Sequence, residues 1–287
     1  MTVGDWILLD EQHRFLRLLE RRSLFRRKAP GSKVDEQFIA ANVDTVFIVC
    51  SLNDDFNLSR IERYLTLVNE AKAEAVIVLT KSDLCDDADT KRQQVQALDP
   101  FLLIETVNAL ESSTLQGLRS WCGKGQTIAF MGSSGVGKST LVNSLMNNHV
   151  QVTGAIREDD SKGRHTTTSR SIHKMPEGGL LLDTPGMREI QLTASEDGLA
   201  ETFSDVELLV EQCRFGDCQH TNEPGCAIRA ALENDTIDAR RVDNYFKLMR
   251  EQARNSASLA ERRSNDKQLG KFYRSVQSES RNRKKGY

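Results

Sequence analysis

The sequence predicts an α/β fold with a mainly parallel sheet, flanked by smaller segments at both ends. Two observations predict this class. Between Thr45 and Met131, short apolar runs alternate with stretches of helical spacing, an order typical of parallel strands joined by helices. A glycine-rich turn at residues 132–139 then separates one of these runs from a helical stretch, as in folds that hold a phosphate at one edge of the sheet.

Each element is predicted from a local pattern. Runs of β-branched and apolar residues predict strands at 45–51, 75–79, 101–104 and 127–131. Helical spacing or helix-compatible composition predicts helices at 58–68, 88–98, 115–121 and 140–146. The runs 171–175 and 180–183 are separated by Pro176 and two glycines, which predicts a hairpin. After Thr193 the chain becomes polar and helical, so we expect a domain boundary near this residue.

Length and composition limit the classes of protein. The chain has 287 residues, of which 38% are hydrophobic, and this is enough for a core in one to three domains. No stretch approaches the roughly 20 consecutive apolar residues of a membrane span. Residues 1–10 also lack the basic-then-apolar layout of a secretory signal. We therefore expect a cytoplasmic protein without a membrane partner.

The net charge of −2 averages over an uneven distribution. Residues 1–28 carry 7 basic and 4 acidic side chains, and residues 261–287 carry 9 and 3, so their net charges are +3 and +6. The rest of the chain then carries −11. Because nucleic-acid phosphates attract cationic segments, any such contact is expected at the two ends.

The turn after the strand at 127–131 fits the phosphate-loop pattern G-x-x-x-x-G-K-[ST]. In such loops, backbone N–H groups and a helix N-terminus surround phosphate oxygens. Lys138 is then the catalytic lysine that contacts the β and γ phosphates, and Ser139 ligates Mg²⁺. An ordinary glycine turn is the alternative, which the flanking strand and helix disfavour. The predicted phosphate-binding residues are Gly132, Ser133, Ser134, Gly135, Val136, Gly137, Lys138, Ser139 and Thr140.

Two further motifs follow strands of the same predicted sheet. Thr80, Lys81, Ser82 and Asp83 fit [NT]-K-x-D, in which the Asp carboxylate accepts from two guanine N–H groups that adenine does not present. Asp183 and Gly186 fit D-x-x-G, whose Asp holds Mg²⁺ through water and whose Gly senses the γ-phosphate. Each motif alone is common in turns. Their joint position at the carboxyl ends of strands predicts a site for GTP with Mg²⁺.

Cysteine spacing predicts a metal site in the C-terminal part of the chain. Cys213, Cys218, His220 and Cys226 supply three thiolates and one imidazole from one short segment. This set suits one structural Zn²⁺ in tetrahedral coordination, with no open position for catalysis. The alternative is four unrelated polar or buried residues. Cys50, Cys85 and Cys122 stand apart and are expected to be core or surface thiols.

The order of the motifs differs from that of an ordinary GTPase. The base-recognition motif precedes the phosphate loop, and D-x-x-G follows it, which is the order that a circular permutation gives. The chain resembles the RsgA (YjeQ) family of circularly permuted GTPases. The resemblance lies in this order, in the segments 21–23, 40–44 and 163–168, and in the cysteine cluster. The resemblance covers nearly the whole chain and implies an OB barrel, a permuted GTPase domain and a zinc domain.

The resemblance also implies the domain limits. About 35 residues precede Phe38, too few for a five-stranded barrel, so we expect only a partial OB-like segment at 1–36. The permuted GTPase domain is then expected at 37–192, and a helical zinc-binding domain with a basic tail at 193–287.

The predicted hydrolysis site lacks the usual glutamine. Many GTPases place glutamine directly after D-x-x-G to orient water, whereas here the residue is Met187. The resemblance offers His165, in a segment that corresponds to switch I, as the group that accepts a hydrogen bond from water. One of the threonines at 166–168 would complete the Mg²⁺ shell, and Thr167 is preferred. An exposed loop histidine is the alternative for His165.

These expectations, with the resemblance, predict a GTPase that binds the 30S ribosomal subunit and assists its late maturation, with turnover stimulated there. The basic tail, which is interleaved with Phe272 and Tyr273, is expected to contact phosphates of 16S rRNA, although such tails are often only solvated. A monomer is expected. The alternatives are an RNA-binding zinc module with a passive guanine-nucleotide site, and a permuted GTPase of the large subunit, against which the zinc ligands argue.

Overall fold

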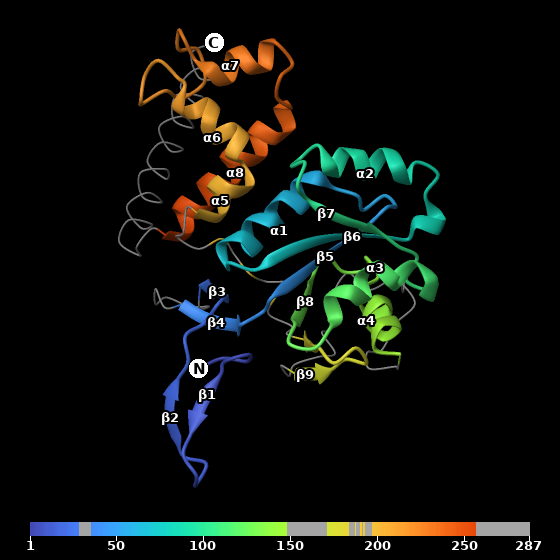
Figure 1. The fold of residues 1–287 in the computed structure, drawn as a ribbon. Helices are drawn as coiled ribbons and strands as arrows, with labels where there is room; N and C mark the ends of the chain where they lie inside the picture. The colour runs from blue at the N-terminus through green and yellow to red at the C-terminus, as the bar shows by residue number, and fades with distance from the viewer. Residues whose placement is uncertain are drawn as a thin grey trace, which may run out of the picture.

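A six-stranded sheet forms the centre of the fold in the computed structural model, which describes residues 1–28, 36–147, 171–183, 187, 190, 192 and 197–256 (Figure 1). The strand order is β7-β6-β5-β8-β10-β9, and all neighbours are parallel except β9 and β10. The predicted α/β class with a mainly parallel sheet is confirmed. The strands are β5 (Thr45–Ser51), β6 (Glu74–Thr80), β7 (Leu103–Thr106), β8 (Thr127–Met131), β9 (Ser171–Lys174) and β10 (Leu180–Asp183).

Both faces of the sheet are buried, as β5 illustrates. All seven of its residues are buried, and successive side chains point to opposite faces of a strand. Ile48 belongs to the same core as α1 (Leu58–Glu70) and α2 (Ala88–Gln96), whereas Phe47 belongs to the core of α3 (Gln116–Arg119) and α4 (Lys138–Met146). The continuous apolar run of this strand is therefore explained by helices on both sides (Figure 1).

The predicted elements are present, and two of them are wrong in detail. The strand expected at 101–104 begins at Leu103, because Asp99 starts a turn in which its Oδ1 accepts from the Phe101 N–H at 2.8 Å. Phe101 is 89% exposed. The single helix expected at 115–121 is instead η2 (Ser112–Leu115), α3 and η3 (Ser120–Cys122). The predicted hairpin is confirmed as the antiparallel pair β9–β10.

The N-terminal strands form two antiparallel pairs. β1 (Ile7–Leu9) pairs with β2 (Phe15–Leu18), and β3 (Leu24–Lys28) pairs with β4 (Glu36–Ala41). An isolated bridge joins Val3, which precedes β1, to Ala40 of β4. In the β1–β2 hairpin, the residues of β1 and most of β2 are exposed, so this hairpin adds little to the core.

A buried polar junction joins these strands to the central sheet. Ser23, which is 3% exposed, donates from Oγ to the Val43 carbonyl at 2.7 Å. Asn42 has a left-handed backbone (φ 53°), donates from Nδ2 to the Gly4 carbonyl at 2.9 Å and accepts from the Arg22 N–H at 2.9 Å. The sequence segments 21–23 and 40–44 therefore meet in one place. Their polar residues satisfy backbone groups that the turn into β5 would otherwise bury without partners.

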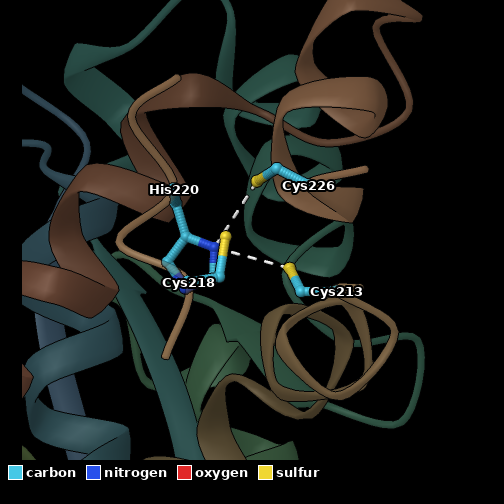
Figure 2. Close-up of side chains that lie close together, drawn as sticks. All are labelled: Cys213, Cys218, His220 and Cys226. Atoms are coloured by element: carbon cyan, nitrogen blue, oxygen red, sulfur yellow. Dashed lines mark hydrogen bonds between the residues drawn. The ribbon is translucent and has the colours of Figure 1, made fainter. Parts of the chain in front are cut away.

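Four C-terminal helices pack on the α1 side of the sheet (Figure 1). They are α5 (Asp197–Thr202), α6 (Ser204–Glu211), α7 (Ala227–Glu233) and α8 (Ala239–Ser256). A Cβ at Gly198 of α5 would lie 2.5 Å from the Thr66 carbonyl oxygen of α1, so glycine permits the close contact of the two helices. The segment between α6 and α7 carries the predicted metal ligands (Figure 2).

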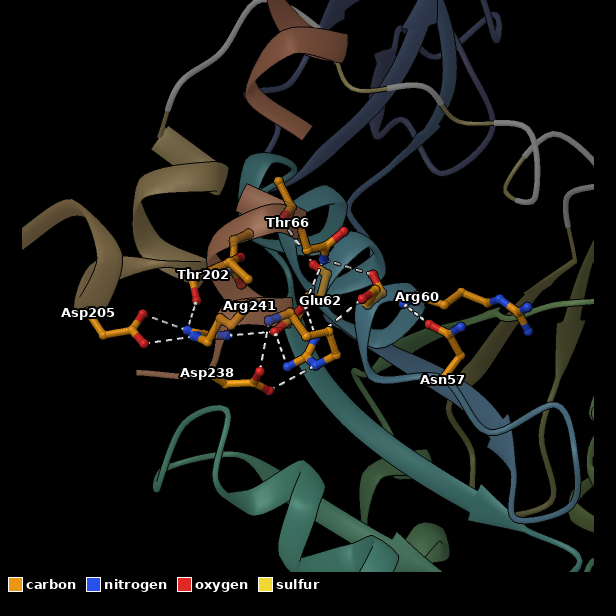
Figure 3. Close-up of polar contacts among 12 residues, drawn as sticks. Asn57, Arg60, Glu62, Thr66, Thr202, Asp205, Asp238 and Arg241 are labelled. Carbon is orange, nitrogen blue, oxygen red and sulfur yellow. Dashed lines mark hydrogen bonds and ion pairs between the residues drawn. The ribbon is translucent and has the colours of Figure 1, made fainter. Parts of the chain in front are cut away.

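An ionic network around one buried carboxylate, here called the α1–α8 clamp, consists of Glu62, Arg240, Arg241, Asn244 and Asp205 (Figure 3). Glu62 of α1 is 0% exposed. Its carboxylate accepts from Arg240 Nη1 at 2.8 Å, Arg241 Nη1 at 2.9 Å and Asn244 Nδ2 at 2.6 Å. Arg241 also donates through Nε and Nη2 to Asp205, at 2.7 Å each. Because a buried carboxylate is costly unless fully paired, α1 and α8 are fixed to each other.

We expect Glu62→Gln to lower the free energy of unfolding by about 3 kcal/mol, because it leaves two buried or half-buried arginines without their shared anion. Urea unfolding followed by far-ultraviolet circular dichroism measures the change. Glu74→Gln, which alters an exposed carboxylate, is the matched control and is expected to change the free energy by less than about 0.5 kcal/mol. Equal stabilities of the two variants would contradict a structural role for the clamp.

Candidate functional site

The loop between β8 and α4 lies at the carboxyl edge of the sheet. Gly132 directly follows β8, and a Cβ at this position would overlap the Val49 carbonyl oxygen of β5. Gly137, at φ 94°, precedes the first residue of α4, and this left-handed conformation favours glycine. Both glycines thus favour the turn that places the N-terminus of α4 at the sheet edge, where backbone N–H groups of a helix can bind anions.

Lys138 lies inside this loop. It is 7% exposed, and its Nζ donates to the Gly132 carbonyl at 2.8 Å and to the Ser133 carbonyl. These carbonyls satisfy an ammonium that could not otherwise be buried. A phosphate that enters the loop would meet this cation and the positive end of the α4 dipole. Ser139 and Thr140 follow on the first turn of α4 and are half-buried.

Thr80 links the base-recognition motif to the phosphate loop. It ends β6, is 0% exposed, and donates from Oγ1 to the Val136 carbonyl at 2.6 Å. Lys81 follows with a left-handed backbone (φ 59°), and η1 (Ser82–Leu84) is a short 3₁₀ turn on which Asp83 is exposed. The structure therefore brings two of the three predicted motifs into direct contact.

Part of the third motif lies at the same edge. Asp183 ends β10, and Leu182 before it is in register with Ala129 of β8. Met187 is 2% exposed and belongs to the core on the α1 side of the sheet, so its side chain is occupied in packing. The predicted residues Gly186, His165 and Thr167 lie outside the described residues.

Sequence reasoning missed one loop at this edge, residues 107–110 after β7. The Ser82 N–H donates to the Val107 carbonyl at 3.4 Å, and Ser144 Oγ of α4 donates to the Ala109 carbonyl at 2.7 Å. The loop therefore borders the base-recognition turn and is tied to the phosphate-loop helix. These two contacts use backbone carbonyls of the loop, so no side-chain motif marks it. Its position after a strand of the parallel sheet was the available signal.

The four predicted metal ligands lie together (Figure 2). Their donor atoms are all within 4.8 Å of one another. His220 Nδ1 is 3.5 Å from Cys213 Sγ and 3.5 Å from Cys226 Sγ. Tetrahedral coordination with ordinary Zn–S and Zn–N bond lengths places such atoms about 3.6 Å apart. The donor set and its spacing are thus compatible with zinc.

Local structure holds these ligands in place. Cys226 is the N-cap of α7, and its Sγ accepts from the Arg229 N–H at 3.5 Å. The His220 ring lies 5.2 Å from the Phe246 ring of α8. Between the ligands, backbone N–H groups of Glu223 itself and of its neighbours hold the pKa of the Glu223 carboxyl at about 2. The loop is therefore organised by a charged residue that is not a ligand.

The remaining cysteines match their predicted status. Cys50 and Cys122 are buried, and burial raises the pKa of both thiols, that of Cys122 to about 12. Such thiols are poor nucleophiles at neutral pH. Cys85 is half-buried on the loop after Asp83.

The fold and the edge described above define a P-loop GTPase whose base-recognition strand precedes its phosphate loop in the chain. The family model described as RsgA GTPase matches residues 18–193, which is more than half of the chain. The chain therefore belongs to the RsgA GTPase family, and it is a GTP-hydrolysing enzyme for which Mg²⁺ accompanies GTP.

Relatives of known name support the same family. Small ribosomal subunit biogenesis GTPase RsgA 2 of Vibrio parahaemolyticus is 65% identical over all 287 residues, which span 80% of that relative. Small ribosomal subunit biogenesis GTPase RsgA of Xanthomonas campestris pv. campestris is 49% identical over 262 residues, or 91% of this chain and 72% of the relative.

Two solved structures share the fold. YjeQ from Thermotoga maritima superposes with a TM-score of 0.63 and 27% identity, covering 88% of this chain and 84% of that one. YloQ, described as a circularly permuted GTPase, has a TM-score of 0.58 and 24% identity, covering 89% and 82%. The second likeness concerns the fold alone.

Within the ranges that the structure describes, no helix combines the length and the hydrophobicity needed to cross a lipid bilayer.

Proposed function

We propose that this GTPase binds the small (30S) ribosomal subunit and assists its late maturation. The bound subunit stimulates the hydrolysis of GTP to GDP and phosphate. Hydrolysis then separates the GTPase from the subunit. The names of the relatives support the choice of the small subunit. The observation that carries the enzymatic part is the Thr80–Val136 hydrogen bond, which joins a guanine-type motif to a phosphate loop closed around its own lysine.

The positions of these residues at the sheet edge support the nucleotide assignments. Lys138 and the N-terminus of α4 would hold the β and γ phosphates, and Ser139 would ligate Mg²⁺, with Asp183 acting through water. Asp83 is exposed on η1, where its carboxylate would accept from guanine N1–H and N2–H₂. The proposed site is completed by backbone groups of Gly132–Thr140, by Thr80–Ser82 and by Gly186.

The hydrolytic step is assigned to the segment that corresponds to switch I. His165 would orient the attacking water, and Thr167 would complete the Mg²⁺ shell. Met187, which occupies the usual position of the glutamine, is buried in the core, so another group must orient the water.

The cluster of Cys213, Cys218, His220 and Cys226 is proposed to hold one structural Zn²⁺. Four protein ligands fill a tetrahedral shell, so the metal would stabilise the segment between α6 and α7 without contacting substrate. The 3.5 Å separations between the His220 nitrogen and two of the thiol sulfurs support this assignment.

The remaining proposals concern partners and organisation. The +6 charge of residues 261–287 supports contact between this tail and 16S rRNA phosphates. We also propose a cytoplasmic monomer with a partial OB-like segment at 1–36, a permuted GTPase domain at 37–192 and a helical zinc-binding domain with a basic tail at 193–287.

The decisive experiment is multiple-turnover GTP hydrolysis alone, with 30S subunits and with 50S subunits. We expect slow turnover alone, because the described residues at the site supply no arginine finger, and at least a tenfold increase with 30S only, as partner-supplied groups provide in other GTPases. No turnover under any condition would favour a passive nucleotide site, and stimulation by 50S would favour the large subunit.

His165→Ala is expected to reduce stimulated turnover while GTP affinity is retained.

For the metal, we expect one zinc per chain by elemental mass spectrometry. Cys226→Ser removes a ligand and the N-cap of α7 and is expected to lose most of the zinc and to lower the melting temperature. Cys85→Ser is the matched control, since Cys85 lies outside the cluster, and its zinc content is expected to equal that of the wild type. Full zinc occupancy in Cys226→Ser would contradict the assignment.

For the tail, a chain that ends at Ser256 retains all of α8 and is expected to bind 30S subunits at least tenfold more weakly at low salt, with a shallower dependence on salt concentration. A full-length variant with the nine basic tail residues replaced by glutamine separates charge from length. Unchanged affinity and salt dependence in both chains would exclude tail contact with rRNA.

A further inference from the structure

Lys91 of α2 connects two loops at the carboxyl edge of the sheet, where the nucleotide site is proposed. This edge is called the nucleotide edge below. Its Nζ donates to the Leu52 carbonyl at 2.9 Å, and Leu52 lies in the loop after β5. The same Nζ lies 2.9 Å from Asp87 Oδ1 and donates to Cys85 Sγ at 3.4 Å. Cys85 and Asp87 lie in the loop that follows Asp83. Neither Lys91 nor its partners belong to the motifs discussed above.

The chemistry of the ammonium group suits this position. An ammonium has three N–H donors, and here three acceptors from two loops surround it. The side chain is 22% exposed, and the Phe56 ring lies 5.8 Å from Nζ, so the contacts are partly shielded from water. Its hydrogen bond with Asp87 raises the pKa of the Lys91 amine, which keeps the group cationic.

Among the described residues, the other contacts of the base-recognition turn, residues 81–84, are long or exposed. Its first residue follows Thr80, which is firmly bonded to the phosphate loop. The Ser82 N–H reaches the Val107 carbonyl only at 3.4 Å, and Leu84 is 70% exposed. Behind the turn, Cys85 Sγ donates to Asp87 Oδ1 at 3.0 Å, and Lys91 contacts both residues. The turn is thus anchored in front by Thr80 and behind by the group of Cys85, Asp87 and Lys91.

We propose that Lys91 is a positioning residue that holds η1, and with it Asp83, in the orientation needed to recognise guanine. This inference rests on the proposed role of Asp83. Guanine offers the carboxylate both N1–H and N2–H₂, whereas hypoxanthine lacks the amino group and offers only N1–H. A displaced Asp83 would therefore lose more interaction with GDP than with IDP.

The test is the affinity of Lys91→Met for GDP and for IDP, measured by calorimetry on the full chain. Methionine keeps an unbranched stem of similar length and removes the ammonium. We expect GDP to bind about fivefold more weakly, the effect of one lost hydrogen bond, and IDP about twofold more weakly, which corresponds to about half of that free energy. The preference for GDP over IDP therefore falls. Lys124→Met, which alters an exposed lysine before β8, is the control and leaves the preference unchanged.

Asp83→Ala separates this inference from the proposed function. If Asp83→Ala abolishes the preference for GDP over IDP and Lys91→Met leaves it intact, the role of Lys91 is overturned while that of Asp83 stands. If Asp83→Ala leaves the preference intact, the proposed guanine contact itself fails. An equal loss of GDP and IDP affinity in Lys91→Met, with a lower melting temperature, would mean general loosening and would also overturn the positioning role.

Discussion

The burial of one carboxylate, that of Glu62, determines how the C-terminal helices are joined to the central sheet. A fully buried anion requires cationic and polar partners, and α8 supplies Arg240, Arg241 and Asn244. Because α1 also packs on the central sheet, it belongs to two structural units at once. The helices that carry the metal ligands are thus attached to the sheet that carries the phosphate loop, by an ionic contact as well as by apolar packing.

The nucleotide edge depends on a second constraint, the common direction of the strands. Because β5, β6, β8 and β10 are parallel, their carboxyl ends meet at one edge whatever their order in the chain. Circular permutation changes which loop comes first and leaves this edge intact. Thr80 and Val136 are 56 residues apart, yet they form a short hydrogen bond there.

Much of this arrangement is predictable from sequence, and each exception has a physical cause. Strands such as β5 are marked by residues that suit burial on both faces, and the phosphate loop and the Cys₃His set are marked by residue types that their chemistry requires. Glu62 and Lys91 resemble ordinary surface charges in a helical stretch, because their partners lie in other elements. The start of β7 was misplaced because the Asp99 turn outweighs the apolar character of Phe101.

The clamp also has a consequence for the order of folding during synthesis. Glu62 and Arg240 are 178 residues apart, and at about 5–20 residues per second a ribosome needs roughly 9–36 s to translate that interval. Throughout it, the carboxylate of Glu62 has no arginine partner from α8 and must remain hydrated. The sheet can form early, but the docking of α8 on α1 must wait until α8 itself has been synthesised.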